Sequence, residues 1–259
     1  MKDLNGKTVL ITGAAQGVGK ETALIFADAG TNVVISDINQ SSLAALELEL
    51  KGKGYSVLAK VCDVSNVDDI DELVKITLSK FEKIDYLVNN AAVSQTKKMT
   101  EITSQDWDNV FAVNVKGTFF MLITVIKSMI QKNIKGCVVN VASIAGEKGR
   151  PNFLVYAASK AAVMNMTKGA ALEFAPNGIR INAVAPGTVD TPMWKDVAGK
   201  ISIIENITVE EVQDKWISKI PLGRLASPKD IANMILYLCS DKAAYITGQV
   251  INVCGGLSI

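Results

Sequence analysis

Residues 8–19, which read TVLITGAAQGVG, decide the fold of this chain. The apolar and β-branched run at 8–12 predicts a strand buried on both faces, and residues 21–28 are expected to form a helix. Glycines in the turn between them permit a close approach of the backbone to a pyrophosphate, and the start of the helix supplies free N–H groups. A strand, a glycine-rich turn and a helix in this order predict a nucleotide-binding unit.

Apolar runs and amphipathic segments alternate along the rest of the chain. Further strands are expected at 32–36, 56–61, 84–88, 136–141, 179–184 and 250–253. Helices are expected at 41–51, 67–81, 114–132, 153–174 and 228–239. This pattern predicts the α/β class: a Rossmann-type, doubly wound parallel sheet of seven strands in a single domain spanning 1–259.

One long irregular segment, from about 188 to 221, interrupts the alternation. Loops of this length in compact domains are often lids or binding loops, so we expect a substrate lid here. Thr208 and Glu211 have the spacing of a capping box, which predicts a helix inside the segment.

The absence of histidine is the most restrictive feature of the composition. It excludes Ser-His-Asp and Cys-His nucleophiles and HExxH zinc sites, so Tyr, Lys, Asp, Glu or Cys must carry any acid–base chemistry. Apolar residues make up 49% of the 259 positions and charged residues 20%, which is typical of a folded globular protein. Because Lys+Arg (27) and Asp+Glu (26) nearly balance, we expect neither a nucleic-acid nor a membrane partner.

The four cysteines predict neither a disulfide framework nor a metal site, because none are spaced as CxxC and no histidine is available. Cys137, Cys239 and Cys254 lie in apolar runs and are expected to be buried thiols, which indicates a reducing, cytoplasmic environment. The polar residues 1–6 do not resemble a signal peptide. The longest apolar run, 119–126, is far shorter than the roughly 20 residues of a membrane span.

Acidic and amide residues follow the predicted strands at their carboxyl ends, where parallel sheets bind ligands. Asp37 lies 18 residues after Gly19, near the roughly 20-residue offset at which a carboxylate accepts hydrogen bonds from the adenosine ribose. This carboxylate would repel a 2′-phosphate and no arginine is adjacent, so the sequence predicts NAD; the alternative is that Asp37 only caps the next helix. Asp63 and Asn89 end two further strands, where turn chemistry alone would also explain them.

Tyr156 and Lys160 are candidate catalytic residues, because a spacing of four places both on one face of a predicted helix. An ammonium group beside a phenol lowers the pKa of the phenol and gives an acid–base pair without histidine, although an exposed surface pair would show the same spacing. Ser143 follows a predicted strand and is expected to hydrogen-bond the substrate oxygen as charge develops on it. Asn114 lies at the start of a long predicted helix.

Taken together, these residues resemble the short-chain dehydrogenases/reductases over essentially the whole chain. The matching motifs are Thr12-Gly13-x-x-x-Gly17-x-Gly19, Asp63-Val64, Asn89-Asn90-Ala91, Asn114, Ser143, Tyr156-x-x-x-Lys160, Pro186-Gly187, Thr247-Gly248-Gln249 and Gly255-Gly256. The family often has Gly and Asp at the positions of Ala92 and Cys254, and neither departure touches the catalytic residues.

The resemblance implies a role for each matching residue. Tyr156 would donate or accept the proton, and Lys160 would bind the nicotinamide ribose and lower the pKa of the tyrosine. Ser143 would position the carbonyl or hydroxyl, and Asn114 would hold a water in a proton relay. The cofactor-binding set, from the residues and the resemblance together, is Gly13, Gln16, Gly17, Val18, Gly19, Asp37, Asp63, Val64, Asn89, Ala91, Tyr156, Lys160, Pro186, Gly187, Val189 and Thr191. The resemblance also implies a homotetramer.

The expected activity is the NAD-dependent interconversion of a secondary alcohol and a ketone. Segments 186–194 and 219–225 resemble polyol and acetoin/butanediol dehydrogenases, which favours a small polyol, sugar alcohol or vicinal diol as the substrate. Glu147 is a candidate acceptor for substrate hydroxyls, or else an exposed loop carboxylate. Trp194 is expected either to cover the pocket or to anchor the lid.

Three alternative functions share part of this pattern. A 3-oxoacyl thioester reductase is the alternative within the family, although such enzymes usually use NADPH and carry a basic residue near the second strand that this chain lacks. Nucleotide-sugar epimerases and dehydratases have a different glycine spacing and a longer carboxyl-terminal domain. A non-catalytic NAD(H)-sensing regulator would be expected to lose Tyr156 or Lys160, and both are present.

Overall fold

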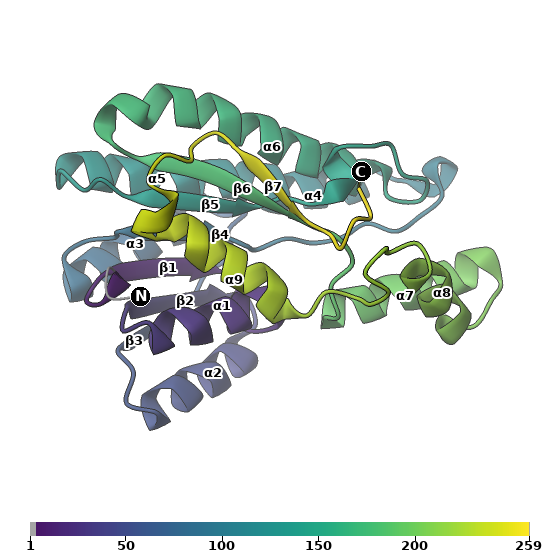
Figure 1. Ribbon diagram of the computed structural model, residues 1–259, viewed down its shortest axis with the longest axis horizontal. Coiled ribbons are helices and arrows are strands. Elements are labelled where there is room, and N and C mark those ends of the chain that lie inside the picture. Colours follow the sequence, from purple (N-terminus) through teal and green to yellow (C-terminus); the bar gives the residue numbers. More distant parts are fainter. Residues whose placement is uncertain (1–3, 259) are drawn as a thin grey trace.

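Seven parallel strands form a single sheet in the order β3-β2-β1-β4-β5-β6-β7, as Figure 1 shows. The structure is a computed structural model that describes residues 4–258. The strands are β1 (Thr8–Thr12), β2 (Asn32–Asp37), β3 (Val57–Val61), β4 (Tyr86–Asn89), β5 (Cys137–Val141), β6 (Arg180–Pro186) and β7 (Val250–Val253). The predicted doubly wound parallel sheet is confirmed, and each predicted strand is present with ends shifted by two residues at most.

Helices cover both faces of this sheet. The longer helices are α1 (Gly17–Asp28), α2 (Gln40–Gly52), α3 (Val67–Phe81), α4 (Ser104–Phe111), α5 (Thr118–Gln131), α6 (Leu154–Phe174), α7 (Pro192–Glu205), α8 (Val209–Ile217) and α9 (Pro228–Cys239). Short helical turns are η2 (Met99–Glu101), η3 (Ala112–Gly117, a π-helix), η4 (Ile144–Gly146), η5 (Ala175–Asn177) and η6 (Asp241–Ala243). Helices α1, α2 and α9 pack on one face, and α3, α5 and α6 on the other (Figure 1).

The two-sided cover explains why the strands are continuous apolar runs rather than alternating ones. On β1, Val9 and Ile11 point into the core beneath α1 and α9, whereas Leu10 points into the core beneath α3 and α5. Because the side chains of a strand alternate between faces, a strand covered on both sides needs apolar residues at every position.

The helix expected at 114–132 is longer and less regular than predicted. It begins as α4 at Ser104, passes through the π-helix η3, and ends with α5 at Gln131. The early start has a local cause, because Thr103 and Asp106 form a capping box in which each side chain accepts a backbone N–H of the other residue. Asp takes the place of the more usual Glu or Gln in this box.

The segment at 188–221 is mostly helical, which corrects the expectation of a long irregular stretch. Helix α8 follows the predicted capping box of Thr208 and Glu211, and α7 was not predicted. A parallel β-bridge joins Val189 to Ala226, so the two ends of the segment are held side by side. In Figure 1, α7 and α8 lie together at one end of the molecule, beyond the sheet.

The cysteines only partly follow the prediction. Cys137 and Cys239 are buried as expected and Cys62 is buried as well, but Cys254 is half-buried. The expectation for Cys254 was therefore wrong, because this residue follows β7, at the edge of the sheet. Residues 4–258 contain no group of three potential metal ligands.

Within the described residues, the continuous helical stretch Ser104–Gln131 is long and apolar enough to cross a membrane, judged by length and composition alone. It packs against α3, α6 and β4, which is the environment of a core helix in this fold. Only 44% of its most apolar window is buried, so much of its surface is left uncovered by the chain itself.

Candidate active site

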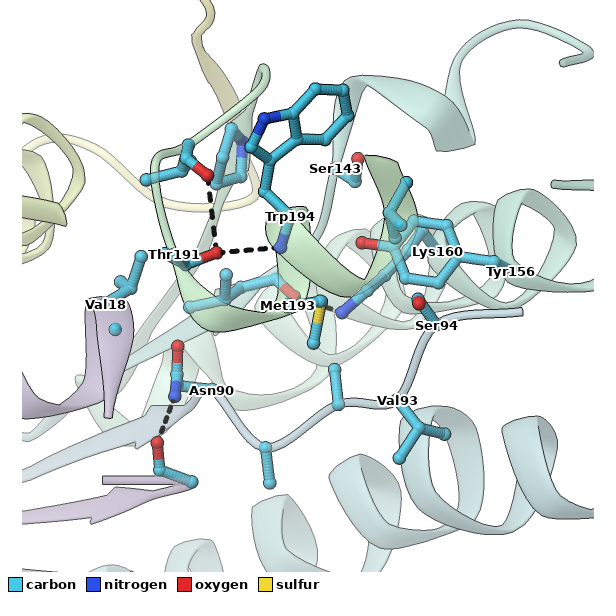
Figure 2. A pocket seen from close by; sticks show the side chains of 18 of the residues that line it. Val18, Asn90, Val93, Ser94, Ser143, Tyr156, Lys160, Thr191, Met193 and Trp194 are labelled. Atoms are coloured by element: carbon cyan, nitrogen blue, oxygen red, sulfur yellow. Dashed lines mark hydrogen bonds between the residues drawn. The ribbon is translucent and has the colours of Figure 1, made fainter. Parts of the chain in front are cut away.

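A cavity of about 470 Å³ opens at the carboxyl ends of the strands. It reaches from Asp37 at the end of β2 to Tyr156 on α6, and the first turn of α7 lies over it. Figure 2 shows Ser143 and Tyr156 on one side of this pocket and Val18 and Asn90 on the other, with Met193 and Trp194 of α7 between them. From β1 the sheet grows outward through β2 and β3 in one direction, and from β4 through β7 in the other, so the order of the strands reverses between β1 and β4. Open α/β sheets bind ligands at such switch points.

The glycine turn, which follows β1 and contains Gly13 and Gly17, forms the floor at one side of the cavity. Gly13 has φ +62°, and a Cβ there would lie 2.7 Å from the Cα of Ala91, so no larger residue fits. Asn90 fixes the turn by donating from its amide to the carbonyls of Gly13 (2.8 Å) and Thr12 (3.0 Å). The N-cap of α1 makes no side-chain hydrogen bond, so the N–H groups of its first turn remain available to an anion.

The carboxylates at the other end of the cavity are held in place by backbone donors. One oxygen of Asp37 accepts from the N–H of Ala15 (3.0 Å) and the other accepts from the N–H of Asn39 (2.9 Å). Each oxygen keeps lone-pair capacity, so Asp37 can still accept hydrogen bonds from a ligand. Asp63 turns one oxygen toward the N–H and hydroxyl of Ser65 (2.9 and 2.8 Å) while it lines the same cavity.

Tyr156 and Lys160 lie one turn apart on α6 and both line the cavity. The Lys160 ammonium is 5.8 Å from the Tyr156 ring centroid and donates to the carbonyl of Val141 (2.8 Å). Burial lowers the pKa of Lys160 to about 8. Burial also raises the pKa of Tyr156, and interaction with the Ser143 hydroxyl opposes this effect. The alternative of an exposed surface pair is excluded, because only 3% of Lys160 is accessible.

Asn114 does not line the cavity, but its hydrogen bonds hold the backbone of residues that do. It lies fully buried in η3, where its amide accepts from the N–H of Val93 (2.9 Å) and donates to the carbonyl of the same residue (2.9 Å). A second donation reaches the hydroxyl of Ser159 (3.0 Å), which itself donates to the carbonyl of Tyr156 (2.7 Å). Asn114 therefore ties the β4–α4 connection to the helix that carries the tyrosine.

The cavity brings together most of the residues predicted for the site. Those that line it are Gly13, Gln16, Gly17, Val18, Asp37, Asp63, Val64, Ala91, Ser143, Tyr156, Lys160, Pro186, Gly187, Val189 and Thr191. Gly19 lies beneath the turn, where a Cβ would meet the Gly13 carbonyl and the Asn90 amide. Asn89 is buried and donates to Asn140 (2.9 Å), so it joins β4 to β5 rather than facing the cavity.

Thr191 and its neighbours form the wall at the end of β6. Thr191 is the N-cap of α7, accepts from the N–H of Trp194 (3.3 Å) and donates to the carbonyl of Val189 (3.3 Å). These bonds aim the first turn of α7 over the cavity. Trp194 both covers the pocket and anchors the segment, because it lines the cavity while packing on Trp216 with ring centroids 5.0 Å apart.

Several lining residues were not predicted from the sequence, notably Arg150, Phe153 and Trp216. They come from the β5–α6 connection and from α8, where no motif marks them. Of the two interpretations of Glu147, the structure supports the exposed loop carboxylate: it does not line the cavity, and its two oxygens accept from Asn252 and Ser258. Because it lies outside the cavity lining, this carboxylate is not placed to accept hydrogen bonds from a bound substrate.

Comparisons with known proteins match nearly the whole chain. A family model described as enoyl-(acyl carrier protein) reductase matches residues 13–258. The 3-oxoacyl-[acyl-carrier-protein] reductase FabG of Thermotoga maritima is 42% identical over 256 residues, covering 99% of this chain and 99% of that protein.

Solved structures give the same fold. A variant of actinorhodin polyketide ketoreductase with NADPH is 34% identical with a TM-score of 0.95, covering 100% of this chain and 99% of that chain. NAD+-bound xylitol dehydrogenase is 33% identical with a TM-score of 0.94, covering 98% of this chain and 100% of that chain. The similar proteins thus include a 3-oxoacyl-[acyl-carrier-protein] reductase, a polyketide ketoreductase and a xylitol dehydrogenase, and the two solved structures hold NADPH and NAD+ respectively.

Proposed function

The chain belongs to the short-chain dehydrogenase/reductase family of oxidoreductases acting on alcohol and ketone groups, and from this premise we propose that it is an NAD(H)-dependent ketone reductase and alcohol dehydrogenase with Tyr156 as its proton donor. The observation that carries this proposal is the convergence of Tyr156, Lys160 and Ser143 on a cavity that also contains the glycine turn and Asp37.

The cavity has the features that a dinucleotide needs. Gly13 leaves room for close approach, the first turn of α1 offers unpaired N–H groups, and Asp37 presents a carboxylate to a ribose. When bound, NADH supplies the hydride for reduction of the substrate carbonyl. The protein supplies the proton and the orientation.

The environment of Tyr156 suits proton donation. Because burial raises the pKa of Tyr156, its phenol is protonated at neutral pH and can protonate a ketone oxygen as charge develops there. The Ser143 hydroxyl, at the start of η4, is the second donor for that oxygen. Lys160 stabilises the phenolate that remains after transfer, and in the reverse direction it favours deprotonation of the phenol.

NAD(H) is the proposed cofactor rather than NADP(H). Both oxygens of Asp37 are fixed by backbone N–H groups, so the carboxylate is held in the cavity at the end of β2. A 2′-phosphate placed beside it would be repelled. The next lining residue, Ile38, offers no positive charge to offset this repulsion.

The choice of substrate lies between a small polyol or vicinal diol and a more apolar oxo compound such as a 3-oxoacyl thioester. Similarity to xylitol dehydrogenase supports the polyol, and similarity to FabG supports the thioester. The cavity favours an apolar substrate, because Phe153, Trp194 and Trp216 line it and Glu147 does not.

A homotetramer and a cytoplasmic location complete the proposal. The uncovered side of the Ser104–Gln131 helical stretch, with Trp107 and Phe119 about half exposed, supports association with further copies of the chain. The unpaired thiols of Cys62, Cys137 and Cys239 support a reducing compartment.

The test is oxidation of NADH, with NADPH in parallel, by the purified protein with fructose, acetoin, diacetyl, acetophenone and an acetoacetyl thioester. We expect turnover with NADH preferred. Tyr156→Phe should lower turnover by roughly 10³-fold while NADH binding, measured by fluorescence, stays unchanged. NADH binding without turnover of any ketone would favour the non-catalytic sensor, and thioester turnover with NADPH would overturn the cofactor assignment.

A further inference from the structure

Apolar and aromatic side chains wall the cavity beyond Tyr156. Trp216 of α8 packs on Trp194 of α7 with centroids 5.0 Å apart and on Phe153 with centroids 6.1 Å apart. Met193 and Val197 of α7 line the same region. A substrate body that fills this region must be apolar, because hydroxyl groups would lose their hydrogen bonds to water against indole and phenyl faces.

One cation, Arg150, stands in this apolar wall. Its guanidinium carbon lies 5.9 Å from the ring centroid of Trp216. Among residues 4–258, Arg150 is in no ion pair and its guanidinium donates no hydrogen bond, although the residue is half-buried and lines the cavity. The other two arginines are engaged: Arg180 donates to backbone carbonyls, and Arg224 is paired with Asp230.

The lone guanidinium defines the ligand chemistry. The cation–π contact with the indole uses no N–H donor of the guanidinium, so its fork of N–H groups is free to bind a carboxylate in a bidentate way. The other cation of the lining, Lys160, is committed to Tyr156 and the Val141 carbonyl. A single negative charge on the substrate therefore matches the single positive charge of this wall.

We propose that the substrate is an apolar, aryl- or alkyl-bearing oxo carboxylate, and that Arg150 binds its carboxylate. This inference rests on the proposed function and narrows its substrate class. In the reaction, the ketone carbon receives a hydride from NADH and the ketone oxygen a proton from Tyr156, so a C=O bond becomes CH–OH and NADH becomes NAD+. The carboxylate is unchanged and serves only to orient the ketone.

A matched pair of substrates tests this assignment. The kcat/KM is measured for 4-oxo-4-phenylbutanoate and for its methyl ester, and again for the acid and ester of 5-oxo-5-phenylpentanoate, which differ in reach. We expect the wild type to prefer one acid over its ester by about tenfold or more, as a charged hydrogen bond provides. In Arg150→Gln this ratio should fall to about one, chiefly through KM, and Arg150→Lys should restore part of it.

Lys148→Gln is the matched control, because Lys148 is an exposed cation in the same connection and does not line the cavity. It should keep the acid-to-ester ratio of the wild type. Circular dichroism and NADH binding establish that Arg150→Gln is folded. Equal ratios in the wild type and Arg150→Gln, or an equal loss in Lys148→Gln, would overturn the role of Arg150.

Binding provides a readout that does not depend on turnover. We expect 4-phenylbutanoate, but not 4-phenylbutanamide, to change the fluorescence of Trp194 and Trp216, and Arg150→Gln to abolish the difference. Turnover of neutral ketones without any preference for acids would refute the carboxylate site and leave the proposed function standing. Failure of every ketone, neutral or acidic, to oxidise NADH would instead refute the proposed function.

Discussion

At the scale of single residues, the buried Lys160 of the candidate active site lowers the stability of the folded protein. Lys160 is an ammonium group in a buried position, and within residues 4–258 its one hydrogen-bond acceptor is the carbonyl of Val141. Burial holds the pKa of Lys160 at about 8 against an ordinary 10.5. This difference corresponds to a destabilisation of about 3 kcal/mol at neutral pH, at about 1.4 kcal/mol per pH unit.

We therefore expect Lys160→Met to be inactive but more stable than the wild type at pH 7. The gain should be about 2 kcal/mol, because loss of the bond to Val141 offsets about 1 kcal/mol of the relieved cost. From about pH 8 to about 10.5 the unfolded chain binds more protons than the folded one, so the wild type becomes more stable as pH rises through this window.

The stabilisation by Lys160→Met should therefore shrink and change sign toward pH 10.5. Urea unfolding of both proteins at equal concentration, at pH 7 and pH 10, measures it. A difference between the two proteins that is the same at both pH values would contradict the burial of a charged lysine.

The residues that sequence patterns could predict are those fixed by short local spacing. Tyr156 and Lys160 are one helical turn apart, Gly13 directly follows β1 and Asp37 ends β2, so each position in the fold is set by its own element. Arg150 and Trp216 could not be predicted, since the first lies in a loop and the second on a helix of another segment. Their contact exists only once α8 has folded back over the cavity.

At the scale of elements, η3 is the feature that joins two halves of the site. The π-helix places Asn114 in the core, where its amide bonds Val93 in the β4–α4 connection and Ser159 on α6. π-bulges are often found at functional sites, and this one positions the helix that carries Tyr156 and Lys160. Removing the amide leaves the N–H and carbonyl of Val93, and the hydroxyl of Ser159, without these partners.

Asn114→Ala should lower the free energy of unfolding by about 2–4 kcal/mol and should lower kcat more than it changes NADH affinity. Thermal unfolding, steady-state kinetics and NADH fluorescence measure the three quantities. Asn109→Ala is the control, because Asn109 is exposed on α4 and, in the described part of the chain, its side chain bonds only Gln105, and it should change stability by less than about 0.5 kcal/mol. Similar effects of the two variants would contradict the bridging role.

Prediction of helices succeeded where the apolar period was regular or a capping box was recognised, as at α8, and failed at the starts of α4 and α7. Helices α3 and α9 were predicted with the bounds that the structure has. Helix α7 was missed although Thr191 and Pro192 are a strong N-terminal signal, because the surrounding residues 186–190 are irregular. The π-helix was not predictable, since its extra residue per turn depends on tertiary bonds of Asn114.

At the scale of the whole molecule, the parallel sheet gathers the candidate site residues at one edge, where its strands end. Parallel strands end on the same side, so residues at or just after the ends of β1 to β6 reach one cavity although they lie far apart in the sequence. This arrangement followed from the alternation of strands and helices. The association of chains could not be predicted in this way. The core accounts for the apolar inner sides of the helices, but the contact between chains would involve their outer sides.

The proposed tetramer has a direct test at the uncovered side of α4 and α5. Phe119 is 45% exposed there and packs edge-on against Phe120, so a second copy would bury it and a charge in its place would face an apolar partner. By light scattering we expect a wild-type mass of about 111 kDa, four times the 27.7 kDa of the chain, and a smaller assembly for Phe119→Glu. Leu48→Glu changes an equally apolar residue that is 71% exposed on α2, across the sheet, and should leave the mass unchanged. A wild-type mass of 27.7 kDa, or an unchanged assembly in Phe119→Glu, would show that this helical surface does not join copies of the chain.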